Sequence, residues 1–340
     1  MRLLQVLAGG LHGGAERFYE DLVVGLAKAG ADQACAIRPF PMRAARLSAA
    51  GCRVSQFMFG GVLDIFTRRR LAKLARLESP DLILGWMNRA CAILPEGSWV
   101  NVGRLGGYYS LKYYQRCHHL VCNTPDIADY VVREGWPAAR AHYIPNFTPV
   151  DDTPAMDRTA LATSPGVSVL LILARLHKVK GVDVAIRALA SIPNAVLWIA
   201  GDGSLEGALR SLAENEGVAD RVRFLGWRDD RSALLKAADV CLVPSRFEPF
   251  GNVVINAWAH GVPLVATASQ GPGFLVRDGD DGLKVPVDDV SALAAAVNAV
   301  LNDGGLSGKL RAGGLERIRK EFSEDAVVQQ YMDLLSTVRR

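Results

Sequence analysis

The sequence alternates short apolar runs with amphipathic helical segments along almost its whole length. Runs such as 3–8, 82–84 and 167–174 have the length of β-strands, and stretches with helical spacing follow them. Strands that alternate with helices predict parallel sheets covered by helices on both faces. The unbroken apolar run at 169–174 is far shorter than the ~20 residues that a spanning helix needs, so we do not expect an integral membrane protein.

Two such series are present, and a proline-containing stretch separates them. Residues 145–165 carry four prolines and no sustained period, which is typical of an interdomain linker. A chain of 340 residues is long enough for about two domains of roughly 150 residues each. We therefore predict a Rossmann-like domain over 1–150, a linker over 151–165 and a second Rossmann-like domain over 166–322. The cleft between two such domains is the expected ligand site.

Positive charge gathers in the first half of the chain. The whole chain has a formal net charge of +4, whereas residues 1–150 hold 18 basic and 11 acidic residues, a net of +7. Between Arg38 and Arg76, nine basic residues accompany one acid, Asp64. This pattern is typical of a surface for an anionic membrane or a phosphorylated acceptor, and equally of a solvated arginine-rich helix face. A nucleic-acid partner is not expected from it.

The six cysteines are scattered, with no C-x-x-C pair. This spacing predicts buried, reduced thiols and neither a disulfide framework nor a zinc site. The first ten residues fit a core strand better than a signal peptide. We therefore expect a cytoplasmic protein without a bound metal.

A glycine-rich loop, GGLHGGAE, joins the first predicted strand to the first predicted helix. Glycines at this place let backbone N–H groups approach a phosphate, and the helix N-terminus adds partial positive charge. Gly13 and Gly14 are therefore candidate phosphate contacts. The loop does not match G-x-G-x-x-G, so the dinucleotide-binding fingerprint is absent.

A basic segment, ARLHKVKG, follows the first predicted strand of the second half. Cations at the carboxyl end of a strand suit a diphosphate, and charge-assisted hydrogen bonds there contribute about 1.5–3 kcal/mol each. Arg175 and Lys180 are the candidates. A solvated basic loop is the alternative interpretation.

The most specific segment, PSRFEPFGN, runs into a predicted helix at 253–260. The Glu248 carboxylate stands beside a tight Phe250–Gly251 turn at the helix N-terminus, where a carboxylate can accept hydrogen bonds from sugar hydroxyls. The backbone N–H groups of Gly251 and Asn252 can meet phosphate or sugar oxygens.

Taken together and in this order, these segments resemble the retaining family 4 glycosyltransferases of the GT-B fold. The resemblance covers nearly the whole chain and includes IAGDG, FLGW, the longer run PSRFEPFGNVVINAWAHGVPLVA and VRDGDDGLKVP. It implies two facing Rossmann-like α/β domains, the first for the acceptor and the second for the nucleotide sugar. It also implies that a helix at 323–340 crosses back to the first domain.

The activity that the resemblance implies is transfer of a hexose-type sugar from a UDP- or GDP-sugar, with retained anomeric configuration. The acceptor is expected to be a glycolipid, a lipopolysaccharide core or another glycan, and neither a cofactor nor a metal is needed. Gly13 and Gly14 match the family's loop near the diphosphate, Arg175 and Lys180 its neutralising cations, and Glu248 the first acid of its E-x7-E motif. Trp227 is a candidate neighbour of the nucleobase, and Phe250, Gly251 and Asn252 complete the donor loop.

The sequence departs from the family pattern at two positions. Asn256 stands where the second acid of E-x7-E is expected, and that acid normally accepts both ribose hydroxyls. An amide offers one acceptor and one donor group without charge. Arg104 lies nearest the place where many relatives carry a histidine after the strand predicted at 99–102. It is a candidate for charge stabilisation or for binding an acidic acceptor.

Alternatives remain open at two levels. The first alternative activity is a nucleotide-sugar-binding protein without turnover, which is suggested because Asn256 lacks the charge of the usual acid. The second is a GT-B-fold epimerase. The string Asp278-Gly279-Asp280 has the D-x-D pattern that binds a divalent metal in a different glycosyltransferase fold. Since it lies within a glycine turn here, we interpret it as part of that turn.

Overall fold

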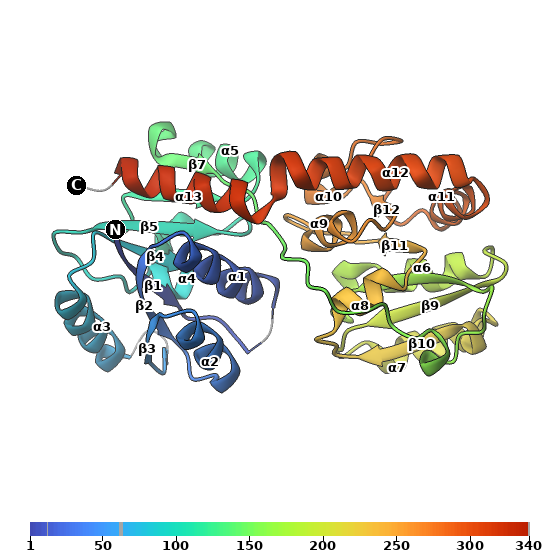
Figure 1. Ribbon diagram of the computed structural model, residues 1–340, viewed down its shortest axis with the longest axis horizontal. Coiled ribbons are helices and arrows are strands. Elements are labelled where there is room, and N and C mark those ends of the chain that lie inside the picture. Colours follow the sequence, from blue (N-terminus) through green and yellow to red (C-terminus); the bar gives the residue numbers. More distant parts are fainter. Residues whose placement is uncertain (12, 61–63, 339–340) are drawn as a thin grey trace. The chain divides into compact units, whose positions relative to one another are not determined.

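The computed structural model describes residues 1–11, 13–60 and 64–338, which form two compact units (Figure 1). Unit 1 comprises Met1–Phe147 together with Phe322–Arg340, and unit 2 comprises Thr148–Glu321. Each unit has its own parallel sheet and its own hydrophobic core. The alternating pattern of the sequence therefore predicted the fold class correctly.

In unit 1, the described residues form a sheet of seven parallel strands in the order β3-β2-β1-β4-β5-β6-β7. β1 and β4 are neighbours, and the chain moves outward from them on both sides, which is the doubly wound topology. The strands are β1 (Arg2–Leu7), β2 (Asp32–Ile37), β3 (Arg53–Gln56), β4 (Leu82–Trp86), β5 (Val100–Leu105), β6 (His119–Cys122) and β7 (Ala141–Tyr143). The helices are α1 (Gly14–Lys28), α2 (Pro41–Ala49), α3 (Ile65–Glu78), α4 (Met87–Cys91), α5 (Pro125–Arg133) and α13 (Glu324–Val338), with 3-10 turns at Leu111–Tyr113 and Ala138–Arg140.

Two hydrophobic layers cover the faces of this sheet. α1, α2 and α13 contribute to one layer, in which Leu22 and Tyr331 are fully buried. α3, α4 and α5 contribute to the other, in which Leu71 and Ile127 are fully buried. Helices on both faces bury each strand on two sides, which explains why the strands read as continuous apolar runs.

The last helix, α13, packs on unit 1 beside α1. Val327, Tyr331 and Leu335 recur at intervals of four residues and form its buried stripe. Gly25 of α1 lets the two helices approach, because a Cβ at this position would come within 2.7 Å of the Val328 side chain. Each fully buried aliphatic side chain contributes about 1.5–3 kcal/mol. The C-terminal helix is therefore an integral part of the unit 1 core.

In unit 2, the described residues form a sheet of six parallel strands in the order β10-β9-β8-β11-β12-β13. The strands are β8 (Ser168–Leu173), β9 (Ala195–Ala200), β10 (Val222–Gly226), β11 (Val240–Val243), β12 (Leu264–Thr267) and β13 (Leu283–Val285). The helices are α6 (Val182–Leu189), α7 (Glu206–Asn215), α8 (Arg231–Lys236), α9 (Asn252–Ala259), α10 (Gln270–Leu275), α11 (Val290–Asn302) and α12 (Gly304–Arg317). A π-helical turn follows at Ile318–Phe322, and 3-10 turns lie at Thr159–Leu161, Lys178–Lys180 and Ala219–Arg221.

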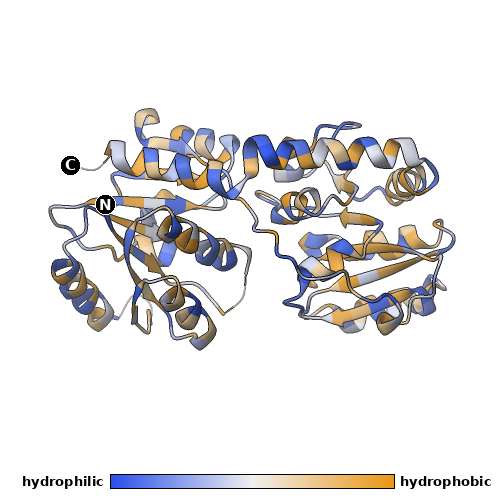
Figure 2. Cartoon of the chain, viewed as in Figure 1, coloured by the Kyte–Doolittle hydropathy of each residue, from blue (hydrophilic) through white to orange (hydrophobic). Residues whose placement is uncertain are grey.

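The unit 2 core lies between this sheet and its helices. Leu170 and Ile172 of β8 pack with Ile186 of α6, Leu209 of α7 and Val297 of α11. Figure 2 shows the strands of both units largely in hydrophobic colours and many helical positions in hydrophilic ones. This is the pattern expected when helices cover a buried sheet with one face and meet water with the other.

The sequence pattern predicted most of these elements but missed five short ones. β3 is an edge strand with polar residues at Arg53, Ser55 and Gln56, so it lacks an apolar run. β13 has three residues, and α4 and α10 have five and six, too few for a visible period. α2 begins at Pro41, and its buried positions, Arg43 and Leu47, include an arginine that the pattern assigns to the surface.

The stretch predicted as a linker lies along unit 2. The carbonyls of Asp151 and Thr153 accept hydrogen bonds from Lys236 Nζ at 2.7 and 2.8 Å. Arg158 pairs with Asp239 at 2.9 Å. Through these contacts the stretch belongs to unit 2, which comprises Thr148–Glu321. Over the described residues, no helix has both the length and the apolar composition to cross a membrane.

Candidate functional site

The topology of unit 2 directs attention to the loops after β8 and β11. These two strands are neighbours, and the chain continues to β9 and β10 on one side and to β12 and β13 on the other. In open parallel sheets, ligands bind at the carboxyl ends of the strands where the order reverses. The loop 174–181 follows β8 and the loop 244–251 follows β11, so both predicted donor segments flank this switch point.

The loop after β8 is held close to its neighbour. Within this loop, the Leu176 side chain is buried, and the His177 Nδ1 accepts a hydrogen bond from the Val179 amide at 3.3 Å. Gly181 has φ 63°, and a Cβ there would lie 1.9 Å from the Pro244 carbonyl oxygen. Only glycine therefore permits this approach of the two loops.

The loop after β11 is tied to the loop after β8 by Arg246. Its amide donates to the Val179 carbonyl at 2.8 Å and its guanidinium donates to the Lys178 carbonyl at 2.7 Å. The guanidinium also pairs with Asp183 at 2.7 Å and Asp288 at 2.6 Å. The hydrogen bonds with Asp183 raise the pKa of Arg246 above its usual range. The sequence analysis missed this residue, because an arginine within a motif gives no sign of which loop it binds.

Lys180 and Glu248 meet at the switch point. Lys180 Nζ donates to Glu248 Oε2, and the two side chains are 17% and 16% exposed. They line a recess of about 10 Å³ together with Ser245, which is enough for about one water molecule. The structure thus brings two predicted site residues together, but as an ion pair that neutralises both charges. A diphosphate that uses the Lys180 charge has to open or share this pair.

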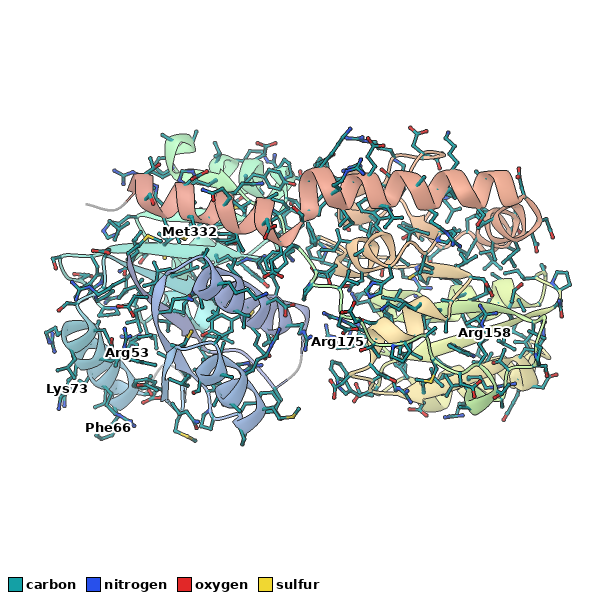
Figure 3. The ribbon with its side chains drawn as sticks, in the orientation of Figure 1. Arg53, Phe66, Lys73, Arg158, Arg175 and Met332 are labelled. Atoms are coloured by element: carbon teal, nitrogen blue, oxygen red, sulfur yellow. The ribbon has the colours of Figure 1, made fainter. Side chains whose placement is uncertain are left out.

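Arg175 is an open cation of this site. It extends from the loop immediately after β8, is exposed and is labelled in Figure 3. Its guanidinium forms neither a hydrogen bond nor an ion pair with any residue in the described part of the chain. Its charge is therefore available to an anion, in contrast to that of Lys180.

The start of α9 places the remaining donor-loop residues. Gly251 has φ 100° and directly precedes the helix, which begins at Asn252, while Phe250 is buried. The Gly271 amide donates to the Glu248 carbonyl at 2.8 Å, so the first turn of α10, which follows β12, supports the same loop. Backbone N–H groups at the first turn of a helix lack intrahelical partners and form a common site for anions.

Asn256 lies one helical turn further along α9 and is buried. Its Oδ1 accepts a hydrogen bond from the Thr148 hydroxyl at 2.5 Å. The amide oxygen that would receive a ribose hydroxyl is thus engaged within unit 2. Binding a ribose there requires this bond to be exchanged.

Trp227 follows β10, the edge strand, at the same end of the sheet. The ring is partly exposed and its Nε1 donates to Asp229 Oδ1 at 3.2 Å. Because neighbouring strands are about 4.8 Å apart, β10 lies roughly 10 Å from β8. An extended ligand is required to span Arg175 and Trp227.

In unit 1 the glycine-rich loop is filled by a carboxylate. Gly13 directly precedes α1 and Gly14 is the first helical residue. Glu16 Oε1 accepts a hydrogen bond from the Gly10 amide at 2.8 Å, and a Cβ at Gly13 would lie 2.2 Å from Glu16 Oε2. The glycines thus make room for an anionic group at the helix N-terminus, and Glu16 of the chain itself occupies part of that room.

Arg104 lies within β5 and is fully buried, so the prediction that the strand ends before it is wrong. Its guanidinium packs 4.9 Å from the Phe18 ring centroid and 5.1 Å from that of Trp86, and Nη2 donates to Asn146. Its buried Nε has no partner, and no carboxylate pairs with Arg104 among the residues that the structure describes. The Arg104 charge is thus stabilised by cation–π contacts with the Phe18 and Trp86 rings.

The turn at 277–282 is held by contacts of its own acids. Asp278 Oδ1 accepts from the Lys284 amide at 2.8 Å, and Asp280 pairs with Lys309 at 2.9 Å. Arg317 pairs with Asp281 at 2.8 Å. These contacts agree with the interpretation of the D-x-D string as part of a turn.

The basic stretch 38–76 divides into paired and open cations. Arg43 and Arg46 pair with Glu20 at 2.9 and 3.1 Å, and Arg53 pairs with acids of β2 and α3. The basic residues of α3 are exposed at positions 68, 69, 70, 73 and 76. The open positive charge is therefore concentrated on α3, because acids of α1 and β2, distant in sequence, neutralise much of the rest.

Comparison with known proteins agrees with these observations. The family model described as Glycosyltransferase Family 4 matches residues 12–152, and that described as Glycosyl transferases group 1 matches residues 167–303. The lipopolysaccharide core biosynthesis glycosyltransferase LpsE of Rhizobium meliloti is 37% identical over 332 residues, 96% of this chain and 97% of that protein. LpsD of the same organism is 35% identical, with 96% and 95% covered.

Solved structures show the same fold. The crystal structure of Anabaena HepE in complex with UDP-glucose has a TM-score of 0.87 at 21% identity, covering 99% of this chain and 100% of that one. WaaG, a glycosyltransferase involved in lipopolysaccharide biosynthesis, has a TM-score of 0.73 at 18% identity, covering 98% and 99%. With two doubly wound units in one chain, the fold is GT-B. The chain therefore belongs to the family 4 glycosyltransferases.

Proposed function

We propose that the protein transfers a hexose-type sugar from a UDP-sugar to a growing lipopolysaccharide core, with retained anomeric configuration and without a metal ion. Its likeness to LpsE and LpsD along 96% of its length carries the acceptor class. The UDP-glucose complex of HepE supports the donor class. The cation-bearing loops at the switch point of unit 2 supply the chemistry that such a donor requires.

The donor diphosphate is bound by fixed positive charge. Arg175 binds it first, because its guanidinium is exposed and unpaired in the described structure. Lys180 joins it when its bond to Glu248 opens. The N–H groups of Gly13 and Gly14 and those of Gly251 and Asn252 donate to phosphate or sugar oxygens. Trp227 lies at the nucleobase end, and Asn256 at the ribose.

Glu248 exchanges partners during donor binding. In the free protein its carboxylate accepts from Lys180. When the diphosphate takes the Lys180 ammonium, the carboxylate is released to accept hydrogen bonds from hydroxyls of the donor sugar. The sugar ring gains positive character in the transition state, so the hydrogen bond to Glu248 strengthens there. A bond that is stronger in the transition state than in the bound donor lowers the barrier to transfer.

Transfer then proceeds on one face of the sugar. The bond between the anomeric carbon and the β-phosphate oxygen breaks, and negative charge grows on the phosphate that leaves. Arg175 and Lys180 stabilise that charge, so the chemistry needs neither a metal ion nor a cofactor. The acceptor hydroxyl forms the new bond on the same face and gives its proton to the leaving phosphate oxygen. Buried Arg104 adds positive electrostatic potential in unit 1, the unit that we propose binds the acceptor.

We further propose that α3 docks unit 1 on the anionic inner face of the cytoplasmic membrane, where a lipid-linked acceptor is found. Phe66 and Leu77 are both 72% exposed and flank the cations Arg69 and Lys73 along the helix. Figure 3 shows Phe66 and Lys73 extending from α3 away from the sheet. Each cation near an anionic leaflet contributes about 1 kcal/mol, and apolar side chains add to it.

The test is transfer itself. Purified protein is given radiolabelled UDP-glucose, UDP-galactose or GDP-mannose with lipooligosaccharide from a strain whose core is truncated, and labelled lipid and free nucleotide are measured. Label in the lipid fraction from one UDP-sugar is the expected result, and the anomeric proton coupling of the product identifies retention. Tight UDP binding without transfer from any donor would favour a nucleotide-sugar-binding protein instead.

A further inference from the structure

Unit 1 contains a cavity of about 300 Å³, and the residues assigned to it are not among the proposed donor-site residues. It lies between the glycine-rich loop and the start of α2, and its walls include Leu11, Arg38, Phe40 and Met58. Its volume is at the lower end of the range for small-molecule sites, which suits one sugar residue better than a whole nucleotide.

Among the described residues, the cavity wall carries positive charge and no acid. Arg38 and Arg43 are the charged residues in the described part of its lining. Each nitrogen of the Arg43 guanidinium already has a partner, because Nε pairs with Glu20 at 2.9 Å and the other two nitrogens donate to the carbonyls of Gly10 and Leu11 at 3.2 and 3.0 Å. It braces the glycine-rich loop and leaves little capacity for a ligand.

Arg38 is different. It follows β2 directly, is half-buried, and forms neither a hydrogen bond nor an ion pair within the described ranges of the chain. Its side chain therefore lines the cavity without a counter-ion from the described residues. Its planar, five-donor geometry matches phosphate and carboxylate groups.

Apolar side chains border the same cavity. Leu11 is 58% exposed and Met58 is 66% exposed, although both line it. Large apolar side chains left open beside an unpaired cation suit a ligand with an anionic substituent and an apolar face. The C–H face of a sugar ring that carries a phosphate or carboxylate has both properties.

The position of the cavity agrees with a role in acceptor binding. Gly9 and Gly10 follow β1 and Arg38 follows β2, so the cavity opens at the carboxyl ends of the parallel strands. The N-terminus of α1 lies at the same end of the sheet. Open α/β sheets bind ligands at this end.

We propose that this cavity holds an anionic sugar residue of the acceptor, either phosphorylated or a sugar acid, next to the residue that receives the new bond. Arg38 binds the anionic group, and Leu11 and Met58 contact the ring. The inference rests on the proposed function, since it names the charge class of the same enzyme's acceptor.

The test uses simple probes and two arginine variants. Binding of glucose 6-phosphate, glucuronate, glucose and inorganic phosphate is measured on the full chain by titration calorimetry and ligand-observed NMR. The wild type should bind at least one anionic sugar at least tenfold more tightly than glucose, and Arg38→Gln should remove that preference. Arg133→Gln, which removes an exposed arginine of α5, should leave it unchanged. A preference for glucose 6-phosphate or for glucuronate identifies the anionic group as phosphate or carboxylate.

Two outcomes would overturn the proposal. Inorganic phosphate that binds as tightly as glucose 6-phosphate would indicate an adventitious ion only, and an Arg38→Gln variant with unchanged probe affinities would remove the assigned contact. UDP affinity and sugar transfer are measured in parallel, and Arg38→Gln should leave UDP affinity unchanged. A chain that binds anionic sugars through Arg38 but transfers no sugar would refute the proposed function and leave the cavity assignment standing.

Discussion

The Lys180–Glu248 pair leads to a prediction in which donor binding and turnover change in opposite directions. Glu248→Gln keeps the shape of the side chain and one oxygen for Lys180, but it removes the charge that neutralises the ammonium. In the wild type, a diphosphate competes with Glu248 for Lys180. In the variant that competition is weaker, so UDP should bind more tightly while sugar transfer falls.

The size of the effect follows from the burial of the pair. Both side chains are less than one-fifth exposed, so their charge-assisted hydrogen bond is in the range of about 1.5–3 kcal/mol. Part of this free energy is regained when Lys180 bonds to the phosphate in place of the carboxylate. The net cost that the Lys180–Glu248 bond adds to UDP binding is therefore about 1–2 kcal/mol. That difference corresponds to a roughly 5- to 30-fold gain in UDP affinity. Loss of a bond to the transition state should lower kcat by about 100-fold.

Three measurements separate the possibilities. Calorimetry gives the UDP affinity, steady-state assays give kcat, and thermal unfolding gives the Tm of the free protein. Lys180→Ala should lower UDP affinity, and Glu316→Gln, which removes a paired glutamate of α12, is the control that should change neither quantity. A Glu248→Gln variant with weaker UDP binding would contradict the competition. Equal losses of activity and Tm would show that Glu248 is only structural.

Three further predictions follow from other parts of the molecule. Gly181→Ala should lower the free energy of unfolding by much more than the ~1 kcal/mol expected for Gly217→Ala. Both glycines have φ near 65°, but of the two only a Cβ at residue 181 would meet a carbonyl oxygen, at 1.9 Å. Urea titration of the two variants compares their free energies of unfolding. Burial, followed by the charge of His142, lowers the pKa of His119 to about 4, so the unfolded chain binds more protons between pH 6.5 and 4. Stability should therefore fall as the pH drops through this window, and His119→Gln should flatten the Tm profile. Replacing the arginines at 68–70 with glutamine should reduce sedimentation with anionic vesicles but not with neutral ones; equal sedimentation of variant and wild type would refute membrane docking by α3.

The sequence determined the doubly wound architecture, and it pointed to the loops that we propose bind the donor. Local periodicity identifies helices and strands whenever the buried face is regular, and parallel strands bring their carboxyl ends to one edge whatever the loops contain. It could not identify β3 or β13, because an edge strand with polar residues and a strand of three residues carry no periodic signal.

Tertiary structure decided which of the charged residues are available. Lys180 and Arg175 look equivalent in the sequence, yet one is paired with a glutamate 68 residues away and the other is open. Arg43 and Arg38 differ in the same way. Electrostatic interactions depend on distance in space and on burial, and neither can be read from a linear pattern. The sequence by itself thus specified the fold and its charged loops, and only packing settled where free positive charge remains to bind a ligand.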